Sequence, residues 1–241
     1  MLKLTKIIFN IMLVTSVLIL ALLWLRKYDL FVINRVKVIG NKLLTKEEII
    51  ELAAIDFSQE VFKIDVDAIK KRLLTDPLIK EAAVSRYLPS AIKIQVKEMD
   101  LIANITCSEL STLDSDGNIV NTKKILAFYD LPVITGTKFN TDSLGNRVAS
   151  QQMYKMIEIL KFLRLTNFEL YHEISEINYN KNYGILLYLR KKTIPIIFGF
   201  DNYLRKINYL SAVYEVLKKK SELSSLKVID VRFNGQVVVR N

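Results

Sequence analysis

Side chains able to do catalytic or metal-binding chemistry are few in this chain. It has one cysteine, Cys107, and one histidine, His172. Thiol catalysis would need these two to meet, and the residues around them do not resemble a nucleophile motif. A zinc site would have at most these two soft ligands, and a single cysteine excludes an intramolecular disulfide. We therefore expect both residues to be structural and predict no catalytic residue, no metal site and no cofactor.

An acidic cluster with metal-like spacing is Asp114-Ser115-Asp116-Gly117-Asn118. A calcium loop of the EF-hand kind needs further oxygen ligands and a glutamate at its twelfth position, which is Ile125 here. We therefore interpret this stretch as a hairpin turn in which Gly117 or Asn118 adopts a positive φ.

The formal net charge of +10 raises the question of an anionic partner. The lysines are scattered, however, and the densest cluster is only Lys218-Lys219-Lys220. This pattern is typical of a solvated basic surface that suits the neighbourhood of anionic lipid. We predict neither nucleic-acid binding nor a small-molecule substrate.

The run from Ile7 to Leu25 contains no charged residue, and Lys3, Lys6, Arg26 and Lys27 flank it. As a helix it would be about 28 Å long, close to the hydrocarbon thickness of a bilayer. A cleaved signal peptide would have a shorter apolar core and a small-x-small cleavage site, and a buried core helix would have a polar side. The run therefore predicts a transmembrane helix, although the balanced charges at its two ends do not decide its direction.

Residues 30–98 follow the pattern β-α-α-β-β. A β-type run through Val36 and Val38 stops at the turn pair Gly40-Asn41, and Thr45 with Glu48 forms a capping box that begins a short helix. The remaining elements are a helix after Asp65 that ends at Asp76-Pro77, a strand over Ile79 to Tyr87, and a strand with alternating Ile92, Ile94 and Val96. We expect two short helices packed on one face of a three-stranded sheet.

Residues 99–241 indicate a larger, mostly antiparallel β domain with two helices. One helix runs from a Ser150 cap to Leu163, and another begins near Asp201. The expected strands cover Leu101 to Thr106, Leu110 to Leu113, Ile119-Val120, Leu131 to Gly136, Glu173 to Tyr179, Gly184 to Arg190, Ile194 to Phe198, Leu226 to Val231 and Gln236 to Arg240. The fold class is therefore α+β.

The last strand has apolar residues on both faces, since Val237 and Val239 point to one side and Val238 to the other. Two interpretations remain open for it. Either it is internal to the sheet, or it lies at an edge and accepts a strand from another protein.

Four phrases in order carry a resemblance to a known family. They are Val36-Lys37-Val38-Ile39-Gly40-Asn41, Val61-Phe62-Lys63-Ile64-Asp65, Asp76-Pro77 through Val84, and Arg86-Tyr87-Leu88-Pro89 running into Ile92 through Glu98. They resemble a POTRA (polypeptide-transport-associated) domain, and together they are similar to the FtsQ/DivIB family of bacterial cell-division proteins. The likeness continues through Ile229 to Phe233 and Gln236 to Arg240. Leu78, Ala91 and Leu101 depart from the usual residues, which marks a divergent member.

The resemblance implies a domain organisation and a binding site. The implied parts are a cytoplasmic tail over 1–6, a transmembrane helix over 7–25, a POTRA domain over 30–98 and a β domain over 99–241. In this family the C-terminal strand region captures a small bitopic coiled-coil protein of the FtsB/FtsL type. Carried onto this sequence, the partner-binding residues are Arg232, Phe233, Asn234, Gln236, Val237, Val238, Val239 and Arg240. Phe233 would be an aromatic anchor, and Arg232 or Arg240 would meet acidic side chains.

The implied function is a non-enzymatic scaffold that links division proteins at the septum. It would be a single-pass type II protein of the bacterial inner membrane, with its bulk outside the cytoplasm. A POTRA-type component of polypeptide transport or envelope assembly is the alternative, although such proteins usually carry tandem POTRA units or a barrel. An anchored cell-wall enzyme is disfavoured by the single histidine and cysteine.

Overall fold

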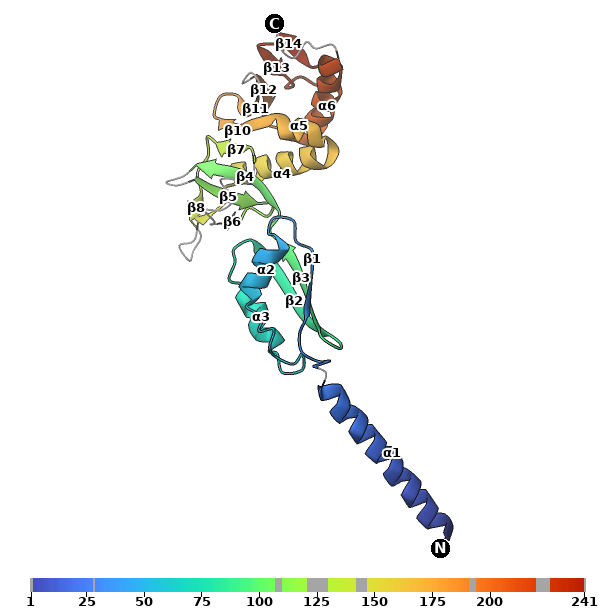
Figure 1. Cartoon of the computed structure of the whole chain (residues 1–241). Helices are drawn as coiled ribbons and strands as arrows, with labels where there is room; N and C mark the ends of the chain where they lie inside the picture. The colour runs from blue at the N-terminus through green and yellow to red at the C-terminus, as the bar shows by residue number, and fades with distance from the viewer. Residues whose placement is uncertain are drawn as a thin grey trace. The chain divides into compact units, whose positions relative to one another are not determined.

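The computed structural model describes residues 2–27, 29–106, 110–120, 130–141, 147–190, 194–219 and 226–240. The chain divides into two compact units, Met1–Met99 and Asp100–Asn241. They are called the first unit and the second unit here, and Figure 1 labels their elements along the chain.

The first unit opens with the helix α1 (Leu2–Lys27), which contains the run Ile7–Leu25. The large apolar side chains described in α1 are between 53% and 70% exposed. Over the side chains that the structure describes, no helix has both the length and the apolar character needed to cross a membrane. The side chains of Leu22 and Leu25 lie outside that described part.

The rest of the first unit has the predicted β-α-α-β-β order. Its elements are β1 (Arg35–Ile39), α2 (Lys46–Ala53), α3 (Val66–Leu73), β2 (Ile79–Tyr87) and β3 (Ala91–Glu98). β3 lies in the middle of the sheet, parallel to β1 and antiparallel to β2. Both helices lie on one face of this sheet (Figure 1), where Ile49, Ile69 and Leu73 are buried. This prediction is confirmed.

Short sequence features determine where these helices and strands begin and end. The Thr45 hydroxyl accepts the Glu48 N–H at 3.2 Å while the Glu48 carboxylate accepts the Thr45 N–H at 2.9 Å, so the predicted capping box is present. Gly40 ends β1 at a φ of +92°, and a Cβ there would lie 2.1 Å from the Val96 carbonyl oxygen. Only glycine allows this approach of the two backbones.

The end of β3 fixes the loop before α2. The Glu98 carboxylate accepts the successive backbone N–H groups of Lys42, Leu43 and Leu44 at 2.8, 2.6 and 2.9 Å. Such charge-assisted bonds are among the stronger hydrogen bonds in proteins. Glu98, more than 50 residues later in the sequence, therefore fixes the loop that leads into α2.

The second unit contains a nine-stranded sheet, a separate two-stranded pair and three described helices. Its elements are β4 (Leu101–Thr106), β5 (Leu110–Asp114), β6 (Ile119–Val120), β7 (Val133–Thr135), β8 (Asn140–Thr141), β9 (Arg147–Val148), α4 (Gln151–Thr166), α5 (Phe168–Glu173), β10 (Ile174–Asn180), β11 (Gly184–Leu189), β12 (Pro195–Gly199), α6 (Tyr203–Lys219), β13 (Val228–Asp230) and β14 (Val238–Arg240).

The strand order in the large sheet is β14-β13-β12-β11-β10-β7-β4-β5-β6. Its β10–β7, β4–β7 and β12–β13 pairs are parallel and the other five are antiparallel. The helices α4, α5 and α6 lie along one side of it (Figure 1), and their buried residues share one core with Ile134, Leu187 and Phe198. The predicted α+β class with a mostly antiparallel second sheet is confirmed.

Two features of the second unit were not predicted from the sequence. The helix α5 was not expected, and it exists because the Asn167 side chain accepts the Leu170 N–H at 2.9 Å and starts a new helix directly after α4. The pair β8–β9 was also not expected.

The turn at Asp114 is as predicted. Gly117 has a φ of +85°, and the buried Asp114 carboxylate accepts the backbone N–H groups of Asp116 and Asn118 at 2.9 and 2.8 Å. Its oxygens are occupied by the turn itself, so this acidic stretch is a structural feature.

Candidate functional site

The predicted binding segment lies at one edge of the nine-stranded sheet. β14 pairs antiparallel with β13, in a register that opposes Val239 to Ile229 and Val238 to Asp230. It ends the strand order, and β13 is its only partner among the strands that the structure describes. Of the two interpretations left open by the sequence, the structure shows an edge strand. Such an edge presents backbone N–H and C=O groups to another strand.

The strand is shorter than predicted, because Gln236 and Val237 precede β14. Val237 and Val239 pack against the core of the second unit and Val238, also half-buried, lies between them. Since side chains alternate along an extended chain, Val238 faces away from that core. The edge therefore offers an apolar side chain together with the exposed Arg240.

A tight turn precedes the strand. The Gln236 N–H donates to the Phe233 carbonyl at 3.5 Å, and Gly235 has a φ of +72°. Phe233 is 49% exposed, and Asn234 and Gln236 are exposed beside it. An aromatic ring half in water at the end of an open edge is a suitable anchor for a protein partner.

Arg232 is bound within the chain. Its Nε donates to Asp230 at 3.0 and 3.1 Å, its Nη2 donates at 2.6 Å, and its backbone N–H donates at 3.1 Å. Burial by itself would raise the pKa of Asp230, but the hydrogen bonds from Arg232 outweigh it and hold that pKa below its ordinary value. The same hydrogen bonds raise the pKa of Arg232.

This ion pair separates the roles of the two arginines in the predicted site. The Arg232 guanidinium carbon lies 5.9 Å from the centroid of the Phe233 ring, within cation–π range, so it positions that ring. Arg240 is exposed and forms no ion pair within the described residues. Of the two arginines, only Arg232 is held in a close ion pair within the described part of the chain.

The buried Lys206 packs at the end of β12, close to Arg232, which precedes the turn before β14. Lys206 on α6 is 4% exposed, and its Nζ donates to the Phe198 carbonyl at 2.8 Å and to Asp201 at 2.7 Å. At Gly199 a Cβ would lie 3.2 Å from Arg232 Cγ and 3.7 Å from Lys206 Nζ. The end of β12, the start of α6 and Arg232 thus form one packed cluster.

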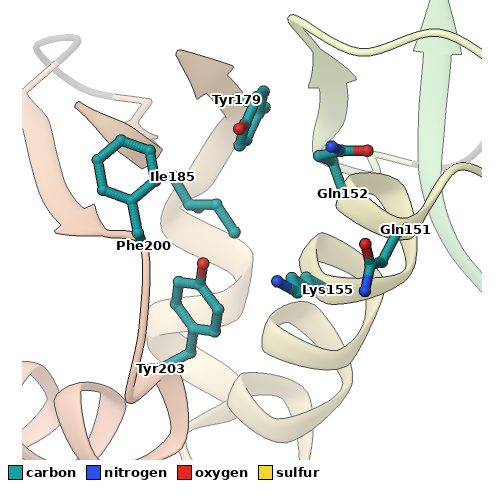
Figure 2. A pocket seen from close by; sticks show the side chains of 7 residues that line it. All are labelled: Gln151, Gln152, Lys155, Tyr179, Ile185, Phe200 and Tyr203. Carbon is teal, nitrogen blue, oxygen red and sulfur yellow. The ribbon is translucent and has the colours of Figure 1, made fainter. Parts of the chain in front are cut away.

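A small cleft opens near this cluster (Figure 2). It is lined by Phe200, which follows β12, by Tyr203 at the start of α6, by Tyr179 and Ile185 from the sheet, and by residues of α4. The α4 side chains are Gln151, Gln152 and Lys155. Figure 2 shows Lys155 reaching from α4 towards Tyr203. The cavity volume is about 70 Å³, far below the roughly 300 Å³ at which ligand pockets begin. It is a surface indentation rather than a small-molecule site.

Among the described residues, the candidates for catalytic or metal chemistry do not form a cluster. Cys107 lies outside the described residues. The His172 ring packs edge-on against the Phe168 ring, with their centroids 4.4 Å apart, and its centroid lies 5.5 Å from that of the Tyr171 ring. Within the described part of the chain, no group of three acidic, histidine or cysteine side chains is placed to hold a metal ion.

Sequence reasoning missed Asp230 and Lys206, which hold the site in shape. A signal existed for each. Asp230 stands two residues before Arg232, so both side chains emerge on the same side of an extended segment. Lys206 stands three residues after Tyr203 and four before Leu210, which places it on the buried side of its helix.

Comparisons with known proteins agree with this architecture. Residues 31–99 match the family model described as a POTRA domain of FtsQ type, and residues 102–239 match the model described as FtsQ/DivIB, C-terminal related. Together the two matches cover both units after α1.

Named relatives extend over most of the chain. It is 29% identical to cell division protein FtsQ of Geotalea daltonii, over 87% of this chain and 76% of that protein. It is 26% identical to cell division protein FtsQ of Syntrophotalea carbinolica, over 88% and 74% of the two chains. It is also 26% identical to cell division protein DivIB of Clostridium tetani, over 88% and 80%. With its C-terminal model matched over more than half of its length, the chain belongs to the FtsQ/DivIB family.

Proposed function

We propose that this protein is a non-enzymatic scaffold of bacterial cell division, which holds other division proteins together at the septum. Its relatives are named as cell division proteins, and its family membership supports a role of this kind. The engaged Asp114 carboxylate and the His172 ring packed on Phe168 favour structural roles for the groups that enzyme chemistry would use.

In this proposal α1 is the single transmembrane helix of a type II protein in the cytoplasmic membrane. The exposure of its apolar side chains supports the assignment, since exposed apolar side chains gain free energy when lipid replaces water. The run Ile7–Leu25 within α1 would cross the membrane, and residues 1–6 would form the cytoplasmic tail. The POTRA domain over 30–98 and the β domain over 99–241 would both lie outside the cytoplasm.

The binding site in this proposal is the β14 edge together with the turn before it. The observation that carries it is the position of β14 at the end of the strand order, with no further strand beyond it among the described residues. A partner strand would pair with β14 through backbone hydrogen bonds and meet Val238, while Phe233 and Arg240 would supply selectivity. A small bitopic coiled-coil protein of the FtsB/FtsL type, with acidic side chains near its captured segment, fits this surface.

Two substitutions test the site. Phe233→Ala removes the exposed ring and Val238→Asp places a charge on the outward face of β14, so each should lower capture of the partner at least about tenfold, as loss of a hot spot does. The measurement is the amount of the bitopic protein that copurifies with the full chain from membranes. Leu165→Asp is the matched control, because Leu165 is 83% exposed on α4, away from the edge.

Circular dichroism of all three variants should equal that of the unmodified protein. Undiminished copurification with both Phe233→Ala and Val238→Asp would remove the edge assignment while leaving the family membership intact.

A further inference from the structure

One end of the sheet in the first unit gathers three segments that are distant in sequence. Arg35 at the start of β1 lies opposite Ala91, so the β2–β3 turn and the chain entering β1 are at the same end (Figure 1). The Asn34 N–H donates to the Ser90 carbonyl at 2.9 Å. The loop before α3 lies at this end too. The Ile33 N–H donates to the Gln59 carbonyl at 3.0 Å, and the Val61 N–H donates to the Phe31 carbonyl at 2.7 Å.

Large apolar side chains are exposed on all three segments. We call these side chains, together with the half-buried Phe31, the apolar end: Leu30, Phe31, Phe62, Tyr87 and Leu88. Phe62 is 53% exposed, Leu88 57%, Tyr87 67% and Leu30 40%. The Phe31 and Phe62 rings lie against each other with centroids 5.3 Å apart. The first unit already has a core of its own, so these side chains are not needed to complete it.

Two hydrogen bonds from Arg86 hold the loop that carries Phe62. The Arg86 guanidinium donates from Nε to the Val61 carbonyl at 3.0 Å and from Nη2 to the Ile64 carbonyl at 2.7 Å. The two carbonyls flank Phe62 in sequence, so the loop is tied down while its ring remains outside. The exposure of Phe62 is thus a property of an ordered loop.

The short link between α1 and β1 limits the distance between the apolar end and α1. Phe31 is the fourth residue after Lys27, where α1 ends, so a fully extended link places it at most about 14 Å from the helix end. If α1 crosses a bilayer, as the proposed function requires, Leu30 and Phe31 therefore lie close to the lipid–water interface. Aromatic side chains at such an interface lie with their rings among the headgroups.

We propose that the apolar end rests in the outer headgroup layer of the membrane that α1 crosses. The occupant is the lipid surface, and the contact rests on the proposed anchoring by α1. Phe62 and Leu88 would enter the interface beside the anchor, so the first unit would be held at two points and its tilt against the membrane would be restricted.

Tryptophan fluorescence tests this, because Trp24 is the only tryptophan in the chain. In a Trp24→Phe background, Phe62→Trp and Leu88→Trp are made singly, with Phe168→Trp as the control, since Phe168 is a 61% exposed aromatic residue of the second unit. The full chain is reconstituted into phosphatidylcholine–phosphatidylglycerol vesicles with brominated acyl chains. The Phe62→Trp and Leu88→Trp proteins should lose emission intensity and shift to the blue relative to vesicles without bromine, and the Phe168→Trp protein should do neither.

Unmodified Trp24 in the same vesicles separates two failures. Unquenched Trp24 would contradict the anchor and with it this inference. Quenched Trp24 with unquenched Phe62→Trp and Leu88→Trp proteins would overturn the lipid contact alone. A blue shift without bromine quenching would also overturn it, because it would mean that protein, rather than lipid, covers these side chains.

Discussion

At the scale of single residues, we expect the pair Asp230–Arg232 to stabilise the second unit beside the β14 edge that is proposed to bind a partner. Replacing Asp230 by Asn removes the charge and keeps the shape. We expect the free energy of unfolding at neutral pH to fall by about 1 kcal/mol, since charge-assisted hydrogen bonds are lost but water reaches part of the pair. The Arg232 side chain is 39% exposed, which is why the loss stays small.

The same pair predicts a dependence on pH. The pKa of Asp230 is lower in the folded protein than its ordinary value. Its stabilising contribution is therefore complete above the ordinary pKa of about 4 and is lost as the pH falls through the lower folded value. Urea unfolding of the full chain in detergent should show the gap between Asp230→Asn and the unmodified protein closing on acidification. Glu158→Gln, at an exposed position of α4, should show almost no gap at any pH.

A gap that persists unchanged into acid would mean that the ionised Asp230 carboxylate is not the source of the difference. Equal stability of Asp230→Asn and the unmodified protein at neutral pH would mean that the pair contributes little.

At the scale of elements, Gly184 and Gly235 have similar backbone angles but different surroundings. Substituting each by alanine therefore separates the cost of close strand packing from the cost of backbone strain. Gly184 has a φ of +74°, and a Cβ there would lie 2.0 Å from the Gly199 carbonyl oxygen. Gly235 has a φ of +72°, and a Cβ there would meet nothing within 4 Å. Gly235→Ala should therefore cost about 1 kcal/mol, the strain of the left-handed conformation alone. Gly184→Ala should cost about 4 kcal/mol or more, because β11 and β12 must move apart.

Thermal unfolding of the two variants measures the difference. Because Gly199 lies against Arg232, the Gly184→Ala substitution should also reduce partner capture at the β14 edge. Similar losses of stability in both variants would indicate that the two strands accommodate the methyl group without separating.

At the scale of the whole molecule, anchoring and recruitment are expected to act together. A fluorescent protein fused to the amino terminus of the full chain should give a band at mid-cell, because division partners gather there. The same fusion to a chain without residues 1–27 should be diffuse in the cytoplasm, since it would lack the helix proposed to cross the membrane. A uniform envelope signal from the full chain would instead favour the transport or assembly role for a POTRA protein.

Features that depend on residues close together in the sequence could be predicted from the sequence alone. The capping box of Thr45 and Glu48 and the turn at Gly117 depend on contacts within four residues, so they are visible in the residue order. The β-α-α-β-β order follows from the spacing of apolar residues in the same way. The short helix α5 was missed because its signal, the Asn167 cap, falls between two longer patterns.

The candidate site was predictable only in part. Phe233 and the three valines were identified from the resemblance, and the alternation of Val237, Val238 and Val239 was readable from the strand pattern. The engagement of Arg232 by Asp230 and the support from Lys206 were not identified. Their contacts depend on how the ends of β12, β13 and α6 come together.

The amino-acid sequence by itself determined the order of elements, the caps, the turns and the apolar run of α1, because each is written in residues a few positions apart. Only the tertiary structure decided that β14 ends the order of the described strands and that Arg232 is paired with Asp230. The physical reason is that strand order joins segments far apart in the chain. Whether a strand is covered, and whether a charge is already paired, depends on those neighbours and on no local pattern.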